Sequence, residues 1–348
     1  MSRVGAALIA LEKLPGEKCL NKVCIYGAGA IGGWIGAGLA DAGCQLSMVA
    51  RGATLAALRQ HGLRLSRADS TRTASVSASD RPEELGVQDL VVIAVKAPAM
   101  LEVARHIPAL LGPQTVVMTA MNGVPWWFLD GFGGEHQGQP LDSVDPGGVI
   151  GKAIPKEHVM GCVVHASCAL SGPGWVRHKL GNRLIIGEPS GGKTARTQVL
   201  AELLVRAGFE AVVSERIQRD TWYKLWGNMT MNPISAITGA TSDLVLQDDL
   251  VRGLATSVML EAREIGNRLG LPIEQAPEER HALTRKLGSI KTSMLQDVEA
   301  GRPVELDALV GAVRELGRLT GVATPFTDAL FGLARLQAQV RGLYPATG

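Results

Sequence analysis

The run VCIYGAGAIGGWIGAGLADAGCQLSMVARG, from Val23 to Gly52, constrains the fold more than any other part of the chain. It reads as an apolar strand, a glycine-rich turn, a helix of small residues and a second strand. Gly27, Gly29 and Gly32 permit a tight turn and the close approach of a pyrophosphate, which the helix N-terminus would hold through free N–H groups. The alternative is a glycine-rich helix that packs closely for steric reasons alone. The predicted dinucleotide-binding residues are Gly27, Ala28, Gly29, Ala30, Ile31 and Gly32.

Arg51 ends the second strand, at the position that selects the cofactor. A domain that prefers NAD usually has Asp or Glu here, because a carboxylate accepts a hydrogen bond from the ribose 2′-hydroxyl. An arginine can instead pair with the 2′-phosphate of NADP. The sequence therefore predicts NADPH as the cofactor, and the alternative for Arg51 is an ordinary solvated charge at a strand end.

The composition excludes several classes of protein. The 348 residues are 46% hydrophobic and 20% charged, which is enough to fill two cores. The 35 basic and 33 acidic residues occur without a long run of either sign, so we expect a small-molecule partner and neither nucleic acid nor membrane. No His, Cys or carboxylate cluster has the spacing of metal ligands, so no metal site is predicted. The five scattered cysteines favour a reducing, cytoplasmic location.

Strands and helices alternate through the first two thirds of the chain. Apolar stretches such as Leu90–Val95 and Thr115–Ala120, separated by helices, predict a parallel sheet covered on both faces. Residues 129–158 are rich in Gly, Pro and Asp and are interpreted as a long surface insertion. From Ile217 onward the strand signals vanish and apolar helical periodicity continues, which makes a homodimer plausible.

The expected fold class is α/β, with an N-terminal Rossmann-type doubly wound sheet followed by an all-α C-terminal domain. Residues 1–20 are expected to form an extension before the fold. Residues 21–216 are expected to form the NADP-binding domain. Residues 217–348 are expected to form a helical domain for substrate binding and dimerisation.

A second stretch, GEPSGGKT from Gly187 to Thr194, matches the phosphate-binding pattern G-x-x-x-x-G-K-[ST]. Two features argue against nucleotide hydrolysis. No later strand ends in the Asp that helps to hold magnesium in such enzymes. Pro189 also removes an N–H group from the loop. We therefore interpret the stretch as a loop that leads into a helix.

The helical half carries a row of polar residues in an apolar setting. Lys224, Asn228 and Asn232 are spaced i, i+4 and i+8, so a helix places an ammonium and two amides on one face. Such a row suits recognition of a carbonyl, a carboxylate and hydroxyls; the alternative is a solvated polar stripe. Further on, a Gly-Arg-Pro turn between Ser293 and Glu305 can bring the end of one helix beside the start of the next.

Five motifs together resemble the ketopantoate reductase family, over nearly the whole chain after residue 21. They are GAGAIGG, VVIAVKA, MNGVPWW, WYKLWGNMTMNPISAITG and TSMLQDVEAGRPVELD, in this order. The resemblance implies an N-terminal domain that binds NADPH and a helical domain that closes over a 2-keto acid. The implied reaction is the reduction of 2-dehydropantoate to pantoate.

The resemblance also implies roles for single residues. Ser242 and Ile290 depart from the family pattern, which expects Asn at the first position and a polar side chain at the second. The identity of the keto acid therefore stays open, with an NADP-dependent reductase of a different 2-keto acid as the alternative. A non-catalytic protein that senses NADPH is the third possibility, although a sensor has no need for the proton donor Lys224. The implied roles are Lys224 as the catalytic lysine; Glu305 as the acid near this lysine and the cofactor ribose; Asn228, Asn232 and Ser293 as substrate ligands; Lys96 and Asn122 facing the cofactor and the reacting centre; and Arg51 at the 2′-phosphate.

Overall fold

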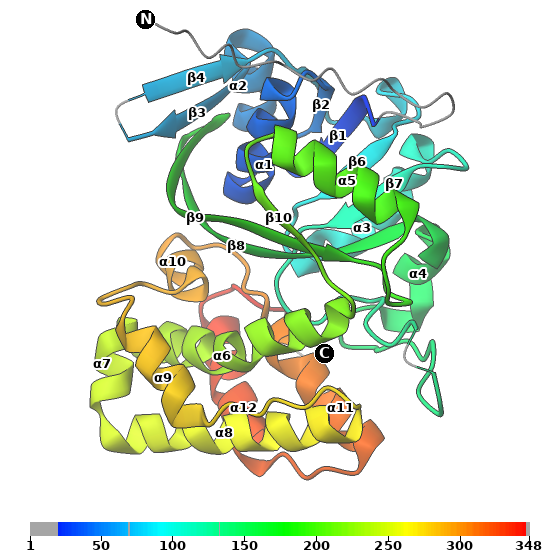
Figure 1. Ribbon diagram of the computed structural model, residues 1–348. Coiled ribbons are helices and arrows are strands. Elements are labelled where there is room, and N and C mark those ends of the chain that lie inside the picture. Colours follow the sequence, from blue (N-terminus) through cyan, green and yellow to red (C-terminus); the bar gives the residue numbers. More distant parts are fainter. Residues whose placement is uncertain (1–19, 69, 132, 346–348) are drawn as a thin grey trace, which may run out of the picture.

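The computed structural model describes residues 20–68, 70–131 and 133–345. A ten-stranded sheet forms one part of the molecule, and helices α6 to α12 lie together beneath it (Figure 1). The predicted extension over residues 1–20 lies outside the described residues, apart from Leu20. The strands are β1 (Lys22–Tyr26), β2 (Gln45–Val49), β3 (Leu63–Arg67), β4 (Ser70–Ala74), β5 (Ser77–Ser79), β6 (Leu90–Ile93), β7 (Val116–Thr119), β8 (Val159–Gly172), β9 (Trp175–Gly187) and β10 (Glu210–Val213).

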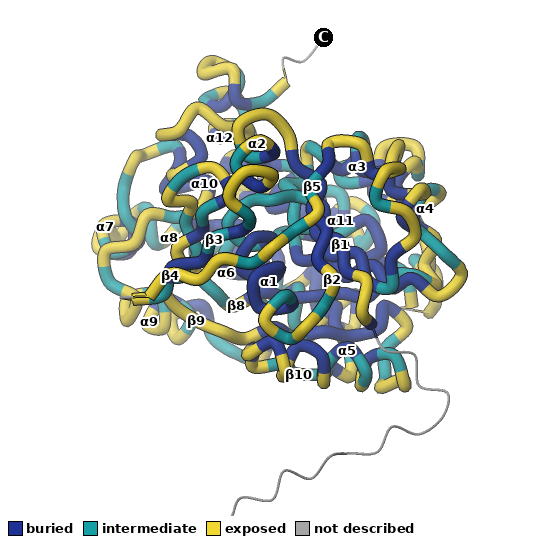
Figure 2. Tube along the Cα trace, turned by 90° about the horizontal axis from the view of Figure 1, so that it is seen from above, coloured by how far each residue is buried: buried dark blue, intermediate teal, exposed yellow. Residues whose placement is uncertain are grey.

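The opening unit folds as predicted. Strands β1 and β2 pair in parallel and are joined by α1 (Ala30–Asp41), whose small residues allow it to lie close to the sheet. A Cβ on Gly33 would lie 2.6 Å from a methyl group of Val176, and a Cβ on Gly36 would lie 3.0 Å from Ile25. Helix α1 is therefore buried at the middle of this part of the molecule, as Figure 2 shows.

The sheet is covered on both faces, as predicted, because successive residues of β1 enter different cores. Val23 and Ile25 pack with α1, whereas Cys24 and Tyr26 pack with residues of α3 (Met100–His106). The remaining helices of this part are α2 (Gly52–His61), α4 (Val149–Ala153) and α5 (Ala195–Arg206).

The expected fold class, an α/β N-terminal part followed by helices, is confirmed, but the predicted parallel arrangement holds for only part of the sheet, which is mixed. The strand order is β4-β3-β9-β8-β7-β6-β1-β2-β5, and β10 also pairs with β9. The strands from β8 to β5 in this order are parallel, but β8 with β9 and β3 with β4 are antiparallel. The two-residue connection Pro173–Gly174 produces the reversal between β8 and β9, with Gly174 at a φ of +63°.

The interpretation of residues 129–158 as a surface insertion also needs correction. Leu129 and Leu141 are buried in the core of the helical part, and Ile150 and Ile154 are buried beside α3. Asp145 is buried as well, and its carboxylate accepts hydrogen bonds from the N–H groups of residues 150 and 151 at 2.6 and 2.9 Å. Apolar residues scattered without periodicity gave no sign of this burial, because the first two contact the core of the helical part and the last two contact the core beside α3.

The C-terminal part is helical from Ile217 onward, after the last strand ends at Val213. The division into two domains at residue 216 stays a prediction. A π-helical turn, Asp307–Gly311, precedes α11. None of the helices in the described part of the chain combines the length and apolar composition of a membrane span. The helices are α6 (Ile217–Thr238), α7 (Ser242–Gln247), α8 (Asp249–Arg268), α9 (Pro277–Arg285), α10 (Ser293–Glu299), α11 (Ala312–Thr320) and α12 (Pro325–Val340).

Helix α6 meets the sheet at Gly161 of β8, which leads to a prediction. A Cβ on Gly161 would lie 2.6 Å from the ring of Trp127 and 2.7 Å from Ile217. We expect Gly161→Ala to lower the free energy of unfolding by about 1–3 kcal/mol, because both neighbours are buried and must shift. Urea unfolding followed by tryptophan fluorescence measures this change.

Gly253→Ala is the matched control, because Gly253 lies in the exposed interior of α8 and its Cβ would meet no described atom within 4 Å. This variant should raise stability by about 0.5–1 kcal/mol, since alanine favours a helix. Equal urea midpoints for Gly161→Ala and the unmodified chain would contradict the close contact.

Candidate functional site

The glycine-rich turn has the shape that a dinucleotide requires. Gly27 has a φ of +106°, and a Cβ there would lie 2.8 Å from the carbonyl oxygen of Ala94. A Cβ on Gly32 would lie 2.1 Å from the carbonyl oxygen of Gly27, whereas one on Gly29 would meet no described atom within 4 Å. The turn is thus open at Gly29, and α1 begins beside it without a side-chain cap within the described structure. These residues fit a pyrophosphate at the helix N-terminus.

Arg51 lies beside this turn. Together with Gly27, Ala28 and Gly29 it lines a pocket that extends to Tyr26 and to Glu102 of α3. The guanidinium of Arg51 is paired with the Glu102 carboxylate, with Nη1 and Oε2 2.9 Å apart. A cation at the end of β2 therefore borders the predicted cofactor pocket, as expected.

Lys224 extends from α6 to the sheet and ends in a buried, polar setting. Its Nζ donates hydrogen bonds to Oδ1 of Asn122 at 2.8 Å and to the carbonyl oxygen of Val164 at 2.7 Å. Burial lowers the pKa of Lys224 to about 8, while Cys162 and Glu305 act in the opposite direction. An ammonium with this pKa is suited to donate a proton near neutral pH.

Asn122 owes its position to the chain that follows it. Gly123 has a φ of +86°, and a Cβ there would lie 2.6 Å from the carbonyl oxygen of Ala308. The same carbonyl accepts a hydrogen bond from the N–H of Val124 at 2.8 Å. This close approach fixes the loop after β7 against the π-helical turn. Asn122, Lys224 and Asn228 consequently line one pocket.

Glu305 lies just before the π-helical turn and is buried. Its Oε1 accepts a hydrogen bond from the N–H of Ala97 at 3.0 Å, across the boundary between the helices and the sheet. Burial raises the pKa of Glu305, while the Ala97 hydrogen bond and the positive charges of Lys96 and Lys224 lower it. Glu305 is therefore within electrostatic reach of both predicted site lysines.

Lys96 forms an ion pair with Asp297 of α10, whose carboxylate also pairs with Arg302 at 3.0 Å. Asp297 is buried and joins the end of β6 to the helical part. The sequence analysis did not identify Asp297, although it lies in the same motif as Ser293. Glu102 was also missed, because nothing in its local sequence indicates a contact with Arg51.

His165 follows Val164 on β8 and is an exposed residue that does not line this pocket. Desolvation of its ring, followed by the positive charge of Lys224, lowers the pKa of His165 to about 4. The imidazole is therefore neutral near physiological pH.

Two predicted substrate ligands lie apart from this pocket. In the described part of the chain, the lining residues include neither Asn232 nor Ser293. Asn232 is buried one turn beyond Asn228 on α6, and Ser293 is exposed at the start of α10, which packs on α6. Their roles as substrate ligands stay predictions.

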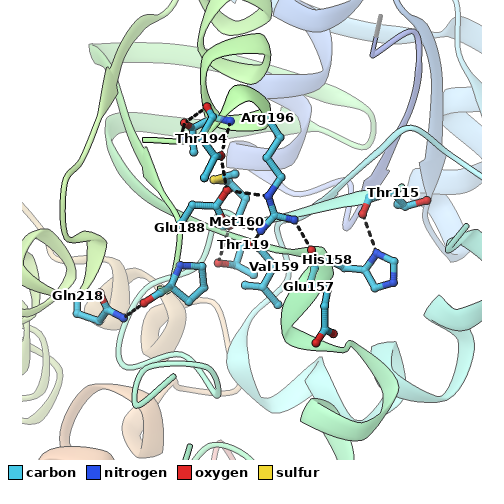
Figure 3. A network of polar contacts seen from close by, with 12 residues as sticks. Thr115, Thr119, Glu157, His158, Val159, Met160, Glu188, Thr194, Arg196 and Gln218 are labelled. Atoms are coloured by element: carbon cyan, nitrogen blue, oxygen red, sulfur yellow. Dashed lines mark hydrogen bonds and ion pairs between the residues drawn. The ribbon is translucent and has the colours of Figure 1, made fainter. Parts of the chain in front are cut away.

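The GEPSGGKT stretch is a loop that leads into α5, as interpreted from the sequence. Its Glu188 is buried, and Oε1 accepts hydrogen bonds from Thr194 at 2.6 Å and from Nε of Arg196 at 2.7 Å (Figure 3). Thr194 also caps α5. The chain's own carboxylate thus binds the groups at this helix N-terminus, which leaves the stretch unsuited to a phosphate.

Both parts of the chain match known family profiles. Residues 23–191 match the family described as "Ketopantoate reductase PanE/ApbA". Residues 216–338 match the family described as "Ketopantoate reductase PanE/ApbA C terminal".

Individual proteins are similar over nearly their full length. A 2-dehydropantoate 2-reductase of Mesorhizobium japonicum is 47% identical over 93% of this chain and 99% of its own. A solved protein of Ralstonia solanacearum MolK2, provisionally named a ketopantoate reductase, is 55% identical with a TM-score of 0.90, over 93% of this chain and 100% of its own. A dimeric ketopantoate reductase of Staphylococcus aureus shares the fold, with 21% identity and a TM-score of 0.71 over 92% of this chain and 99% of its own.

The setting of Lys224 predicts its titration. We expect its ammonium to lose a proton near pH 8, because the buried amine is deprived of water and the ordinary lysine value is 10.5. Lys224 should therefore be protonated below this pH and neutral above it. NMR of a chain with ¹³Cε-labelled lysine follows the titration, and Lys224→Arg identifies the signal by its loss. Titration of that signal only above about pH 10, as in free lysine, would contradict the burial of the amine.

Proposed function

The chain belongs to the ketopantoate reductase family, and from this premise we propose that it reduces 2-dehydropantoate to pantoate with NADPH, using Lys224 as the proton donor. The observation that carries the proposal is the position of the Lys224 ammonium. It is buried at the boundary between the sheet and α6 and bonded to Asn122 and Val164. A positive charge held there can stabilise the negative charge that develops on a carbonyl oxygen during reduction.

NADPH supplies the hydride when it is bound. In this proposal the turn from Gly27 to Gly32 holds the pyrophosphate, and Arg51 holds the 2′-phosphate. Lys96 and Glu305 contribute at the nicotinamide side. The geometry that supports this assignment is the hydrogen bond from Ala97 to Glu305, which brings the acid to the residue that follows Lys96.

The side chains around Lys224 control its proton. Asn122 and Val164 accept hydrogen bonds from two of the three N–H groups of the ammonium and so direct the third, which is available for a substrate oxygen. Glu305 favours the charged form of Lys224 and opposes the effect of burial. Asn228, Asn232 and Ser293 are proposed to bind the carboxylate and hydroxyl of the keto acid. Their amide and hydroxyl groups have the hydrogen-bonding capacity for this role.

The substrate assignment has one specific alternative, a different 2-keto acid. Ser242 and Ile290, which depart from the family pattern, bind each other. The N–H of Ser242 donates to the carbonyl oxygen of Ile290 at 3.0 Å, and Oγ of Ser242 donates to the carbonyl oxygen of Gly288 at 2.9 Å. These groups hold the segment between α9 and α10 in place. The departure of both residues from the family pattern is the reason to test other 2-keto acids.

The proposal is tested by NADPH oxidation with a panel of 2-keto acids that includes 2-dehydropantoate. We expect 2-dehydropantoate to give the highest kcat/KM. We expect Lys224→Ala to lower kcat by about 10²–10⁴, the usual contribution of a general acid, with NADPH affinity little changed. Near-normal turnover of this variant would refute the role of Lys224.

Lys193→Ala is the matched control, because Lys193 is an exposed lysine paired with Glu215 far from the predicted site, and its turnover should be unchanged. A higher kcat/KM for another 2-keto acid would favour the alternative substrate, whereas binding of NADPH without any turnover would indicate a sensor.

We also propose that two copies pair through α12. Five apolar residues on this helix are exposed and follow a spacing of three and four, which places them on one face. Leu333 and Leu336 are 59% and 60% exposed at its centre. A seam of this kind fits a second helix, and the related protein of S. aureus is dimeric. The seam comprises Phe326, Ala329, Leu333, Leu336 and Val340.

A cytoplasmic location stays a prediction from the composition.

Leu336→Glu tests the seam. We expect this variant to be monomeric under conditions in which the unmodified chain is dimeric, because the carboxylate loses its water when the helices pair. Light scattering after size-exclusion chromatography measures the mass. Leu250→Glu is the control, since Leu250 is 81% exposed on α8, outside the seam, and its mass should not change. A dimer that persists in Leu336→Glu would refute pairing through α12.

A further inference from the structure

The carboxylate of Glu102 holds the guanidinium that the proposed function assigns to the cofactor. Arg51 follows β2 and Glu102 lies in the first turn of α3, so the contact joins two elements that are 51 residues apart. Both guanidinium Nη atoms of Arg51 contact a carboxylate oxygen of Glu102. The side chains are 57% and 42% exposed and line the same pocket as the glycine-rich turn. The pair is therefore accessible from the pocket.

A phosphate and a carboxylate compete for the same groups of an arginine. The guanidinium presents a planar fork that binds either anion through two parallel hydrogen bonds. The contact with Glu102 uses this fork. A 2′-phosphate that binds Arg51 must displace the carboxylate or share the guanidinium with it, and the two anions repel each other at that distance.

The groups around the pair do not remove this conflict. Asp80 adds a second negative charge near Arg51. Tyr26 of β1 lines the same pocket, and its phenol is neutral because burial raises its pKa to about 12. The hydrogen bond from Arg51 is the main cause that lowers the pKa of Glu102, and the positive charge of Arg105 on the same helix also lowers it. Glu102 therefore remains an anion when a cofactor enters the pocket.

We propose that Glu102 is a specificity-determining residue for the cofactor. Its carboxylate makes the preference of the chain for NADPH over NADH smaller. The inference rests on the proposed binding of the 2′-phosphate by Arg51. NADPH must take Arg51 from Glu102, whereas NADH has no 2′-phosphate and leaves the pair intact. A carboxylate is also the group that usually accepts a hydrogen bond from a ribose 2′-hydroxyl, and Glu102 places one beside the strand end where that acid usually lies. Arg51 thus favours NADPH and Glu102 favours NADH, although the two side chains form one ion pair.

Binding of cofactor fragments tests the inference without turnover. Calorimetry compares 2′,5′-ADP, which carries the 2′-phosphate, with 5′-AMP, which lacks it. We expect Glu102→Gln and Glu102→Ala to bind 2′,5′-ADP about five- to tenfold more tightly, the scale of one exposed ion pair plus the relief of repulsion. Neither variant should bind 5′-AMP more tightly. In steady-state assays, the ratio of kcat/KM for NADPH to that for NADH should rise by a similar factor.

Glu264→Gln is the matched control, because Glu264 forms an equally exposed pair with Arg268 on α8, and its affinity for both fragments should be unchanged. Unchanged or weaker binding of 2′,5′-ADP by both Glu102 variants would overturn the inference, since Glu102 would then only orient Arg51. Arg51→Ala separates the inference from its premise. This variant should lose affinity for 2′,5′-ADP alone, and if it does not, the assignment of Arg51 fails and the inference fails with it.

Discussion

The burial of one ammonium group ties together the parts of this protein. A charged amine is stable away from water only when its N–H groups are bonded. Lys224 bonds two of its three N–H groups to acceptors from different segments, Asn122 after β7 and Val164 on β8. Neither acceptor is in reach unless α6 lies against the sheet. The same contacts that permit the burial therefore also set the distance between the sheet and the helices that line the pocket.

Close packing of backbone and side chains keeps α6 in this place. Ile217, the first residue of the helix, is fully buried and lies against two glycines of neighbouring strands, Gly161 and Gly187. Side chains at either position would move the helix away from the sheet. A second connection runs through Glu305, which accepts the hydrogen bond of Ala97. Packing at one end of the boundary and polar contacts at the other give the site a defined geometry.

Local patterns predicted the parts of the structure that depend on neighbouring residues. The glycine-rich turn and the polar face of α6 with Lys224 were predicted because spacing along a strand or helix determines which residues share a face. The long antiparallel pair β8 and β9, the burial of residues 129–158 and the partner of Arg51 were not. Glu102 illustrates the reason: it lies 51 residues from Arg51, and a single acidic residue in a helix gives no sign of its contact.

The order of strands has a consequence for synthesis of the chain. Strand β3 pairs with β9, and Trp175 donates a hydrogen bond to Ser66 across 109 residues. During translation, β3 and β4 are synthesised on the order of ten seconds before β9, so β3 lacks this partner strand for that time. During that time the hairpin presents open edges, which invite pairing with other chains. The edge that later pairs with β9 belongs to β3, LRLSR, and its Arg64 and Arg67 place charges there that oppose such pairing.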